Sequence, residues 1–389
     1  MPDAMPARML RPDGSAPDLG SPNARAVYRD LLRFGPRSRS ELTSRLGLSA
    51  PTVTRAARDL LDAGWLHTLG PVARAKGRPH EPLDIEENEG PRFLGVKVTA
   101  DEVHAVASTV RGNVLEELTL PLESTTPTAV VEAIAGPVEA LTGAHPHLLG
   151  LGISVGGRVA DRRTVLGSQL LDWDQPVPLA QMLEERLHLP TVVENDLRAM
   201  LHGLHWFGVG RSYRSFALLT VGAGVGIGVI HAGELVEGRT HVAGLTGMLP
   251  VGQDAEGRPL TFNEAASLGP LLERAQRAGI LHSGAGLPEL RDLVAQGHEG
   301  ARELVAEMAR SLARAAASVA AMLDPEAILL GGETRDLVRS ADPVLEDTLR
   351  ACLAPMQRDI AVRDLPGEFE DWARGAAIVA IQQFVGPAR

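Results

Sequence analysis

Predicted strands and helices alternate along most of this chain, and this alternation restricts the fold more than any other feature. Short apolar runs bounded by glycine or proline predict strands, and apolar residues spaced by three or four predict helices. Strands are expected at 93–98, 102–109, 114–120, 148–155 and 327–330, and helices at 128–141, 177–187, 268–278, 287–295 and 300–323. Such a pattern is typical of an α/β fold, here in two lobes.

Residues 21–85 carry a different pattern. Apolar spacing predicts a helix at 23–34, and Ser38 and Glu41 form a capping box that opens a second helix. A third helix starts with Pro51 in its first turn, where the missing N–H does no harm, and ends before Gly64. Short strands around 65–67 and 83–85 flank a basic loop. Three helices followed by a two-stranded hairpin predict a winged helix-turn-helix.

Charge is unevenly divided between this segment and the rest. The chain has a net charge of -11, whereas residues 20–85 hold 10 Arg and 1 Lys against 6 Asp and Glu. A basic amino-terminal unit on an acidic body is typical of a DNA-binding domain attached to another domain.

The third predicted helix presents the candidate DNA contacts. Arginine can bind guanine in the major groove, and recognition helices use their first turns there. An arginine in the wing can enter a narrow minor groove. The candidates are Ser49, Thr52, Thr54, Arg55 and Arg58 on the helix and Arg78 in the loop. The alternative interpretation is a solvated charged face on a small helical domain.

The cysteine content and the lengths of the apolar runs exclude several other classes of protein. A single cysteine, Cys352, excludes an internal disulfide and a multi-thiolate zinc site. No run of about 18 uncharged apolar residues is present, so no transmembrane helix is expected. The amino terminus lacks an apolar signal segment, so a cytoplasmic location is expected.

The segment Val193-Glu194-Asn195-Asp196 follows a short apolar strand. An amide and a carboxylate together donate and accept hydrogen bonds, which suits vicinal hydroxyls, and the carboxylate could act as a base. The alternative is a turn or a helix cap, which is the commoner use of Asn-Asp pairs.

Four segments in fixed order resemble the ROK family (repressor, open reading frame, kinase). They are 150–159, 193–196, 219–230 and 324–332, and the winged helix resembles the repressor branch at 51–55 and 77–79. The resemblance implies a two-lobed, actin-like ATPase fold of the sugar-kinase and heat-shock type, with the sugar in the cleft between lobes. It also implies that Gly157, Asn195 and Asp196 contact sugar hydroxyls, and that Asp196 occupies the position of the catalytic base.

The sequence departs from the kinase members at several functional positions. Lys97 replaces a metal-facing carboxylate in a first phosphate loop whose glycines are gone, and Ala223 replaces a threonine in the second loop. The chain then has few side chains that could stabilise the charge of Mg-ATP during phosphoryl transfer. We therefore expect that kinase activity is lost and that no cofactor is bound.

The sugar and zinc positions also differ from the family pattern. Leu245 and Met248 replace a glutamate and a histidine, Asn263 replaces a glutamate, and the zinc cysteines are missing. No metal is therefore expected, and a simple hexose should bind less well. Glu264, Arg239 and His241 are candidates to compensate, or are ordinary surface or core residues. The alanine-rich face of helix 300–323 indicates core packing or a dimer contact.

These observations predict four segments: a disordered tail (1–20), the winged helix-turn-helix (21–85), a linker (86–92) and a ROK effector-binding and dimerisation domain (93–389). The expected function is a sequence-specific transcriptional regulator, favoured as a repressor, that binds operator DNA as a homodimer or dimer of dimers and responds to a carbohydrate-type effector. The effector candidates are Gly157, Asn195, Asp196, Asn263 and Glu264. The alternatives are a ROK carbohydrate kinase with an accessory DNA-binding domain, and a DNA-binding protein that senses nothing.

Overall fold

The computed structural model describes residues 19–71, 81–145, 147–240, 242–254, 256–365 and 369–386. They form two compact units, one made of Met1–Phe207 with Phe369–Arg389 and the other of Gly208–Glu368. Most of the expected tail, Arg78 in the basic loop and His241 lie outside the described residues. Leu19, which the sequence assigned to a disordered tail, is buried in the apolar core of the first unit.

The amino-terminal segment contains three helices and a two-stranded antiparallel sheet. These are α1 (Pro22–Phe34), α2 (Arg39–Leu46), α3 (Ala50–Asp62), β1 (Leu66–Thr68) and β2 (Leu83–Ile85). Serine side chains cap all three helices, and Ser38 and Glu41 form the expected capping box. Gly47 ends α2 with a φ of 64°, a left-handed conformation that glycine adopts without strain. We call this segment the head.

The first unit is built around a five-stranded sheet of order β5-β4-β3-β6-β9. Its strands are β3 (Arg92–Val98), β4 (Glu102–Thr109), β5 (Val114–Pro121), β6 (Leu148–Val155) and β9 (Thr191–Asn195). The first three are antiparallel neighbours, and β6 and β9 run parallel to β3. Arg92 therefore begins a strand and does not belong to the expected linker. A small hairpin, β7 (Arg158–Ala160) and β8 (Thr164–Gly167), follows β6.

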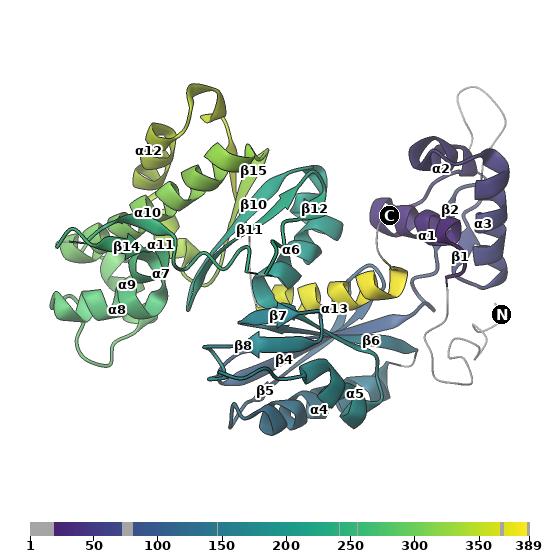
Figure 1. The fold of residues 1–389 in the computed structure, drawn as a ribbon, viewed down its shortest axis with the longest axis horizontal. Coiled ribbons are helices and arrows are strands. Elements are labelled where there is room, and N and C mark those ends of the chain that lie inside the picture. Colours follow the sequence, from purple (N-terminus) through teal and green to yellow (C-terminus); the bar gives the residue numbers. More distant parts are fainter. Residues whose placement is uncertain are drawn as a thin grey trace. The chain divides into compact units, whose positions relative to one another are not determined.

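Helices cover both faces of this sheet (Figure 1). Side chains alternate between faces along a strand, so Leu94, Val96 and Val98 pack with α4 (Pro127–Ala144) and α5 (Leu179–Leu187). Phe93 faces the other side, where α6 (Asp196–Trp206) and α13 (Phe369–Val385) lie.

Helix α13, yellow in Figure 1, lies unusually close to the sheet. A Cβ atom at Gly95 would stand 2.0 Å from the carbonyl oxygen of Ala373, and one at Gly152 would stand 1.8 Å from that of Ala376. Only glycine leaves room for such an approach of helix backbone to strand. The sequence therefore needs glycine at these positions of β3 and β6.

The second unit has a sheet of the same topology, with order β12-β11-β10-β15-β16. Its strands are β10 (Phe216–Val221), β11 (Val225–His231), β12 (Glu234–Leu235), β15 (Ala327–Gly331) and β16 (Ala361–Asp364). As in the first sheet, three strands form an antiparallel meander and two more run parallel to its first strand. A separate hairpin consists of β13 (Pro250–Gln253) and β14 (Pro259–Thr261).

Six helices accompany this second sheet in the described part of the unit. They are α7 (Phe262–Ala266), α8 (Leu268–Arg277), α9 (Leu287–Ala295), α10 (Glu299–Leu323), α11 (Arg335–Ser340) and α12 (Asp342–Cys352), with 3-10 turns at Val209–Ser212 and Pro355–Gln357. The alanine-rich face of α10 is buried within this unit's own core, at Ala309, Ala313, Ala316, Ala317 and Ala320. Of the two interpretations of that face, core packing is the one observed.

Candidate functional site

The acidic strand end identified in the sequence forms the junction of β9 and α6. Asn195 is the last residue of β9, and its side-chain oxygen accepts a hydrogen bond from the Arg198 N–H at 3.3 Å, which caps α6. Its amide nitrogen donates to the Gly157 carbonyl at 2.9 Å and to Asp196 at 3.2 Å. Asn195 therefore serves as a helix cap, and its amide is already engaged within the protein.

Gly157 stands opposite this junction, at the turn between β6 and β7. Its φ is 154°, and a Cβ atom there would lie 2.5 Å from the carbonyl oxygen of Gly167. A side chain would be strained and crowded, so glycine is required to hold the carbonyl where Asn195 reaches it. Gly157, Asn195 and Asp196, the three candidates in the first unit, are thus brought together.

Asp196 forms an ion pair with Lys97, a contact that the sequence did not reveal. The two side chains are separated by 2.6 Å between Nζ and Oδ2, and they are 5% (Lys97) and 23% (Asp196) exposed. The other carboxylate oxygen accepts from the Leu197 N–H at 2.8 Å. Burial tends to raise the pKa of Asp196, but the ammonium and the hydrogen bonds outweigh burial and lower it. A carboxylate held in this way is a weaker base than an unpaired one.

Trp372 lies beside the Lys97–Asp196 pair, and Glu194 precedes Asn195 near the end of β9. The Lys97 ammonium lies 5.4 Å from the ring centre of Trp372 on α13, a distance suited to cation–π attraction. Glu194 is buried, accepts from the Asn195 N–H at 2.8 Å and faces Arg198 and Arg162 at 3.5 and 3.7 Å. A buried carboxylate needs charged or hydrogen-bonding partners, and these contacts provide them. Glu194 therefore helps to fix the position of Asn195 at the end of β9.

The candidates of the second unit lie at the start of α7. The Glu264 carboxylate accepts from the N–H and the hydroxyl of Thr261, at 2.9 and 2.6 Å, in a capping box that lowers the pKa of Glu264. Its proposed role in effector binding conflicts with this engagement. Asn263 has an exposed side chain, and its N–H donates to the Gly247 carbonyl at 2.8 Å.

The nonpolar replacements in this unit are exposed, as is Arg239. Met248 is 79% exposed and Leu245 42%, so neither is committed to the core. Within the described part of the chain, no group of three His, Cys, Asp or Glu side chains could hold a metal ion. No helix among the same residues is long and apolar enough to span a bilayer.

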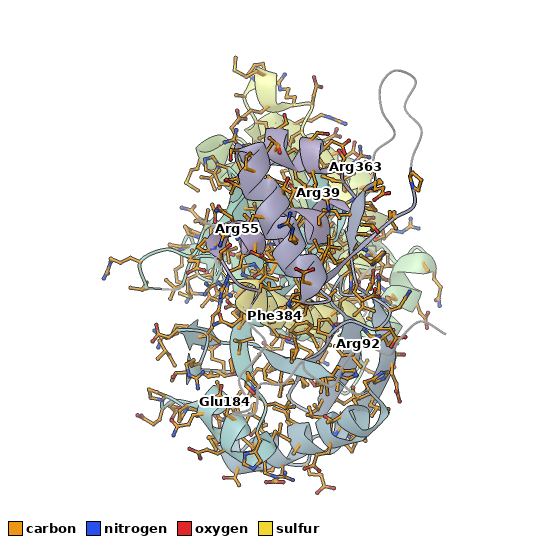
Figure 2. All side chains as sticks on the ribbon, turned by 90° about the vertical axis from the view of Figure 1, so that its right-hand side faces the viewer. Arg39, Arg55, Arg92, Glu184, Arg363 and Phe384 are labelled. Atoms are coloured by element: carbon orange, nitrogen blue, oxygen red, sulfur yellow. The ribbon has the colours of Figure 1, made fainter. Side chains whose placement is uncertain are left out.

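The candidate DNA contacts lie on one face of α3. Val53, Ala56, Ala57 and Leu60 are buried, which turns Thr54, Arg55 and Arg58 to solvent. Figure 2 labels Arg55 on this helix and Arg39 at the start of α2. Ser49 caps α3, and its hydroxyl lies 2.7 Å from that of the half-buried Thr52. Ser49 and Thr52 are therefore engaged with each other.

Arg111 fastens the head to the sheet of the first unit. This residue follows β4, and its guanidinium binds Asp84 of β2 at 2.5 Å, Glu87 at 3.1 Å and the Leu31 carbonyl of α1 at 3.3 Å. Glu87 also accepts from Thr109 and Asn113. The expected linker is thus held to the sheet by hydrogen bonds.

Two helices extend from the acidic strand end to the head. Helix α6 begins at Asp196 and ends at Trp206, where Arg33 of α1 lies 3.3 Å from the ring nitrogen of His205 and 5.4 Å from the Trp206 ring. Helix α13 carries Trp372 in its first turn and Phe384, labelled in Figure 2, in its last. Phe384 packs on Trp65 of the head with ring centres 5.5 Å apart.

The two matching sheets and the strand-end site define a protein of the actin-like ATPase class to which sugar kinases belong. The chain belongs to the ROK family, whose model matches residues 93–380. It is 31% identical over 293 residues to the glucokinase of Streptomyces coelicolor, a match that covers 69% of this chain and 90% of that protein.

Two regulators are also similar to this chain. The xylose repressor of Bacillus subtilis is 22% identical over 233 residues, which is 59% of this chain and 60% of the repressor. The crystal structure of a ROK family transcriptional regulator, a homologue of the E. coli MLC protein, has a TM-score of 0.78 at 20% identity. That likeness covers 93% of this chain and 96% of the other, so the shared fold includes the head.

Proposed function

We propose that this chain is a sequence-specific transcriptional regulator, acting as a repressor, whose affinity for operator DNA is set by a carbohydrate-type effector. The observation that carries the proposal is the course of α6, which begins at the acidic strand end and ends against Arg33 of the head. A ligand that moves Asp196 thereby acts on a helix that also contacts α1.

The head binds the duplex through α3 in this proposal. Arg55 and Arg58, with Thr54 beside them, face solvent on a helix whose other side is packed, as base or phosphate contacts require. Ser49, which caps the helix, and Thr52 in its first turn donate to phosphate, while Arg78 of the wing binds the minor groove. Two half-sites demand a fixed spacing of two heads, so the acting species is a homodimer or a dimer of dimers.

The effector binds at Gly157, Asn195 and Asp196, with Asn263 of the second unit as a further candidate. A sugar has vicinal hydroxyls that both donate and accept, and the Lys97–Asp196 pair offers one group of each kind. The sugar specificities in the names of the glucokinase and the xylose repressor support the carbohydrate class. Glu264 is the weaker candidate because its carboxylate caps α7.

Effector binding must favour one state of the protein over the other to alter DNA affinity. A sugar hydroxyl that accepts a hydrogen bond from the Lys97 ammonium competes with Asp196 for this donor. The competition shifts the first turn of α6, which begins at Asp196. Trp372, which faces the same ammonium, transmits the change to α13. Both helices reach the head, so its position responds to the ligand.

A selection from random duplexes with the full-length chain tests the proposal. Arg55→Ala should weaken binding to the selected duplex about 5- to 150-fold, the range expected for a lost base contact. Arg350→Ala, which removes an equal charge from an exposed position of α12, is the control and should have little effect. If no sequence is enriched, the DNA-binding role is wrong.

The effector role is tested on the selected duplex with a panel of sugars, sugar phosphates and polyols. At least one compound should change duplex affinity, and Asp196→Ala should abolish that response without abolishing DNA binding. If no compound changes the affinity of the wild-type chain, the effector role is wrong and the DNA-binding role stands on its own.

A carbohydrate kinase with an accessory DNA-binding domain is the second candidate, favoured by the 31% identity to a glucokinase. The ion pair of Lys97 with the carboxylate at the base position opposes it. A coupled assay of ADP release with glucose, xylose and other sugars should detect no turnover. Sugar-dependent turnover would establish the kinase.

A further inference from the structure

In the second unit, the carboxylate of Glu333, just after the end of β15, contacts the glycine-rich turn that follows β10. The turn is Gly222-Ala223-Gly224, and Glu333 follows β15 directly after Gly331-Gly332. Oε1 of Glu333 accepts a hydrogen bond from the Ala223 N–H at 2.5 Å. The residues are 110 positions apart, and parallel pairing of β10 with β15 brings their carboxyl ends together.

The surrounding backbone is shaped for this contact. A Cβ atom at Gly222 would lie 2.8 Å from Oε1 of Glu333, so a side chain there would displace the carboxylate. Gly332 has a φ of 103°, and a Cβ atom on it would stand 2.1 Å from the Val221 carbonyl oxygen. Arg291 on α9 holds the Glu333 carbonyl at 2.7 Å and pairs with Asp336.

A glycine-rich turn at the carboxyl end of a parallel strand presents backbone N–H groups that suit an anion such as phosphate. Here the anion is supplied by the chain itself. A bound polyphosphate would have to displace the Glu333 carboxylate from the Ala223 N–H, and the remaining negative charge would repel it at short range.

We propose that Glu333 excludes nucleotide polyphosphates from the Gly222–Gly224 turn, which is an anion site occupied by an internal carboxylate. Removal of this single side chain converts the turn into a binding site for pyrophosphate and for the phosphates of ADP. The inference concerns the second unit alone and does not depend on whether the head binds DNA.

Calorimetric titration of the full-length chain with pyrophosphate, and separately with ADP, tests this assignment in the absence of DNA. Glu333→Ala should bind pyrophosphate at least tenfold more tightly than the wild-type chain. Glu333→Gln keeps an acceptor for the Ala223 N–H and removes the charge, so its affinity should be intermediate. This second variant also decides the question if Glu333→Ala fails to fold.

Glu326 provides a matched control at the opposite end of the same two strands. Its carboxylate accepts from the N–H groups of Arg214 and Ser215 just before β10, at 2.5 and 2.9 Å. Glu326→Ala should gain no pyrophosphate affinity. Equal affinity of the wild type and both Glu333 variants, or an equal gain in Glu326→Ala, would overturn the assignment.

Discussion

The ammonium of Lys97 and the carboxylate of Asp196 lie 2.6 Å apart, although the residues are separated by 99 positions in the chain. Lys97 is near the end of β3, and Asp196 opens α6. By its resemblance to the kinase members, Asp196 is proposed to stand at the position of their catalytic base, and here its carboxylate is paired with the Lys97 ammonium. The same contact ties the central strand of the sheet to a helix that touches the head.

We expect the Lys97–Asp196 pair to stabilise the folded chain, because each largely buried charge is neutralised by the other. Lys97→Met should lower the free energy of unfolding by about 3 kcal/mol, because it leaves a largely buried carboxylate without its partner. Asp196→Asn should cost a similar amount, and the double variant less than the sum of the two. Urea unfolding of the four proteins measures the coupling.

A surface ion pair serves as the control for this cycle. Arg186 pairs with Glu132 and Glu139 on exposed positions of the same unit, so Arg186→Ala should change little. Strict additivity of the Lys97 and Asp196 substitutions would contradict the proposed pairing.

Gly95→Ala and Gly152→Ala should each destabilise the first unit by about 3 kcal/mol or more. The added methyl group meets the backbone of α13, which cannot move aside as a side chain can. Gly143→Ala is the control, because Gly143 lies in α4 with no atom within 4 Å of an added Cβ. That variant should gain up to about 1 kcal/mol from helix propensity. Thermal unfolding compares the three, and equal behaviour would exclude the close helix–strand contact.

His205 should make the stability of the head contact depend on pH. Burial, with a smaller contribution from Arg33, lowers the pKa of His205 from 6.5 to about 4. The unfolded chain therefore binds a proton first as the pH falls, so stability is complete above 6.5 and is lost between 6.5 and 4. His205→Gln should remove about 3 kcal/mol of this dependence. Unfolding measured from pH 7.5 to 4 checks it, and an unchanged slope would count against the neutral buried imidazole.

Arg111→Ala should loosen the head without unfolding the sheet. The substitution leaves Asp84 and Glu87 without their shared cation, so amide exchange over residues 83–93 should rise about tenfold, equivalent to about 1.4 kcal/mol. Arg163→Ala is the control. It breaks an ion pair with Glu184, a residue of α5 that is labelled in Figure 2 and lies outside the head. Hydrogen exchange by mass spectrometry distinguishes the two variants; parallel increases would argue against a specific fastening role.

Local signals in the head were sufficient to predict its helices. Ser38 and Glu41 marked the start of α2, because caps act within one turn of the chain. The alternation of strands and helices likewise predicted most of the first sheet, and strand β15 of the second. Helix α13 was not predicted, since its alanines and glycine make sense only against the backbone of β3, β6 and α6.

The binding candidates were harder to judge from sequence. Asn195 and Glu264 carry the right chemical groups, yet both cap helices in the folded chain. A capping role depends on where a helix starts, and sequence alone locates that boundary only to within about two to four residues. In the effector site that we propose, Asp196 with its partner Lys97 is therefore the strongest candidate, beside Gly157 and Asn195.

The sequence by itself determined the α/β class, the three-helix head and the ROK resemblance, because these rest on short-range periodicity and ordered motifs. Only the tertiary structure decided that Asp196 pairs with Lys97, that Glu333 faces Ala223, and that α6 and α13 reach the head. Each of these contacts joins residues that are distant in the chain, and their distances depend on strand register and on how closely helices pack against the sheet.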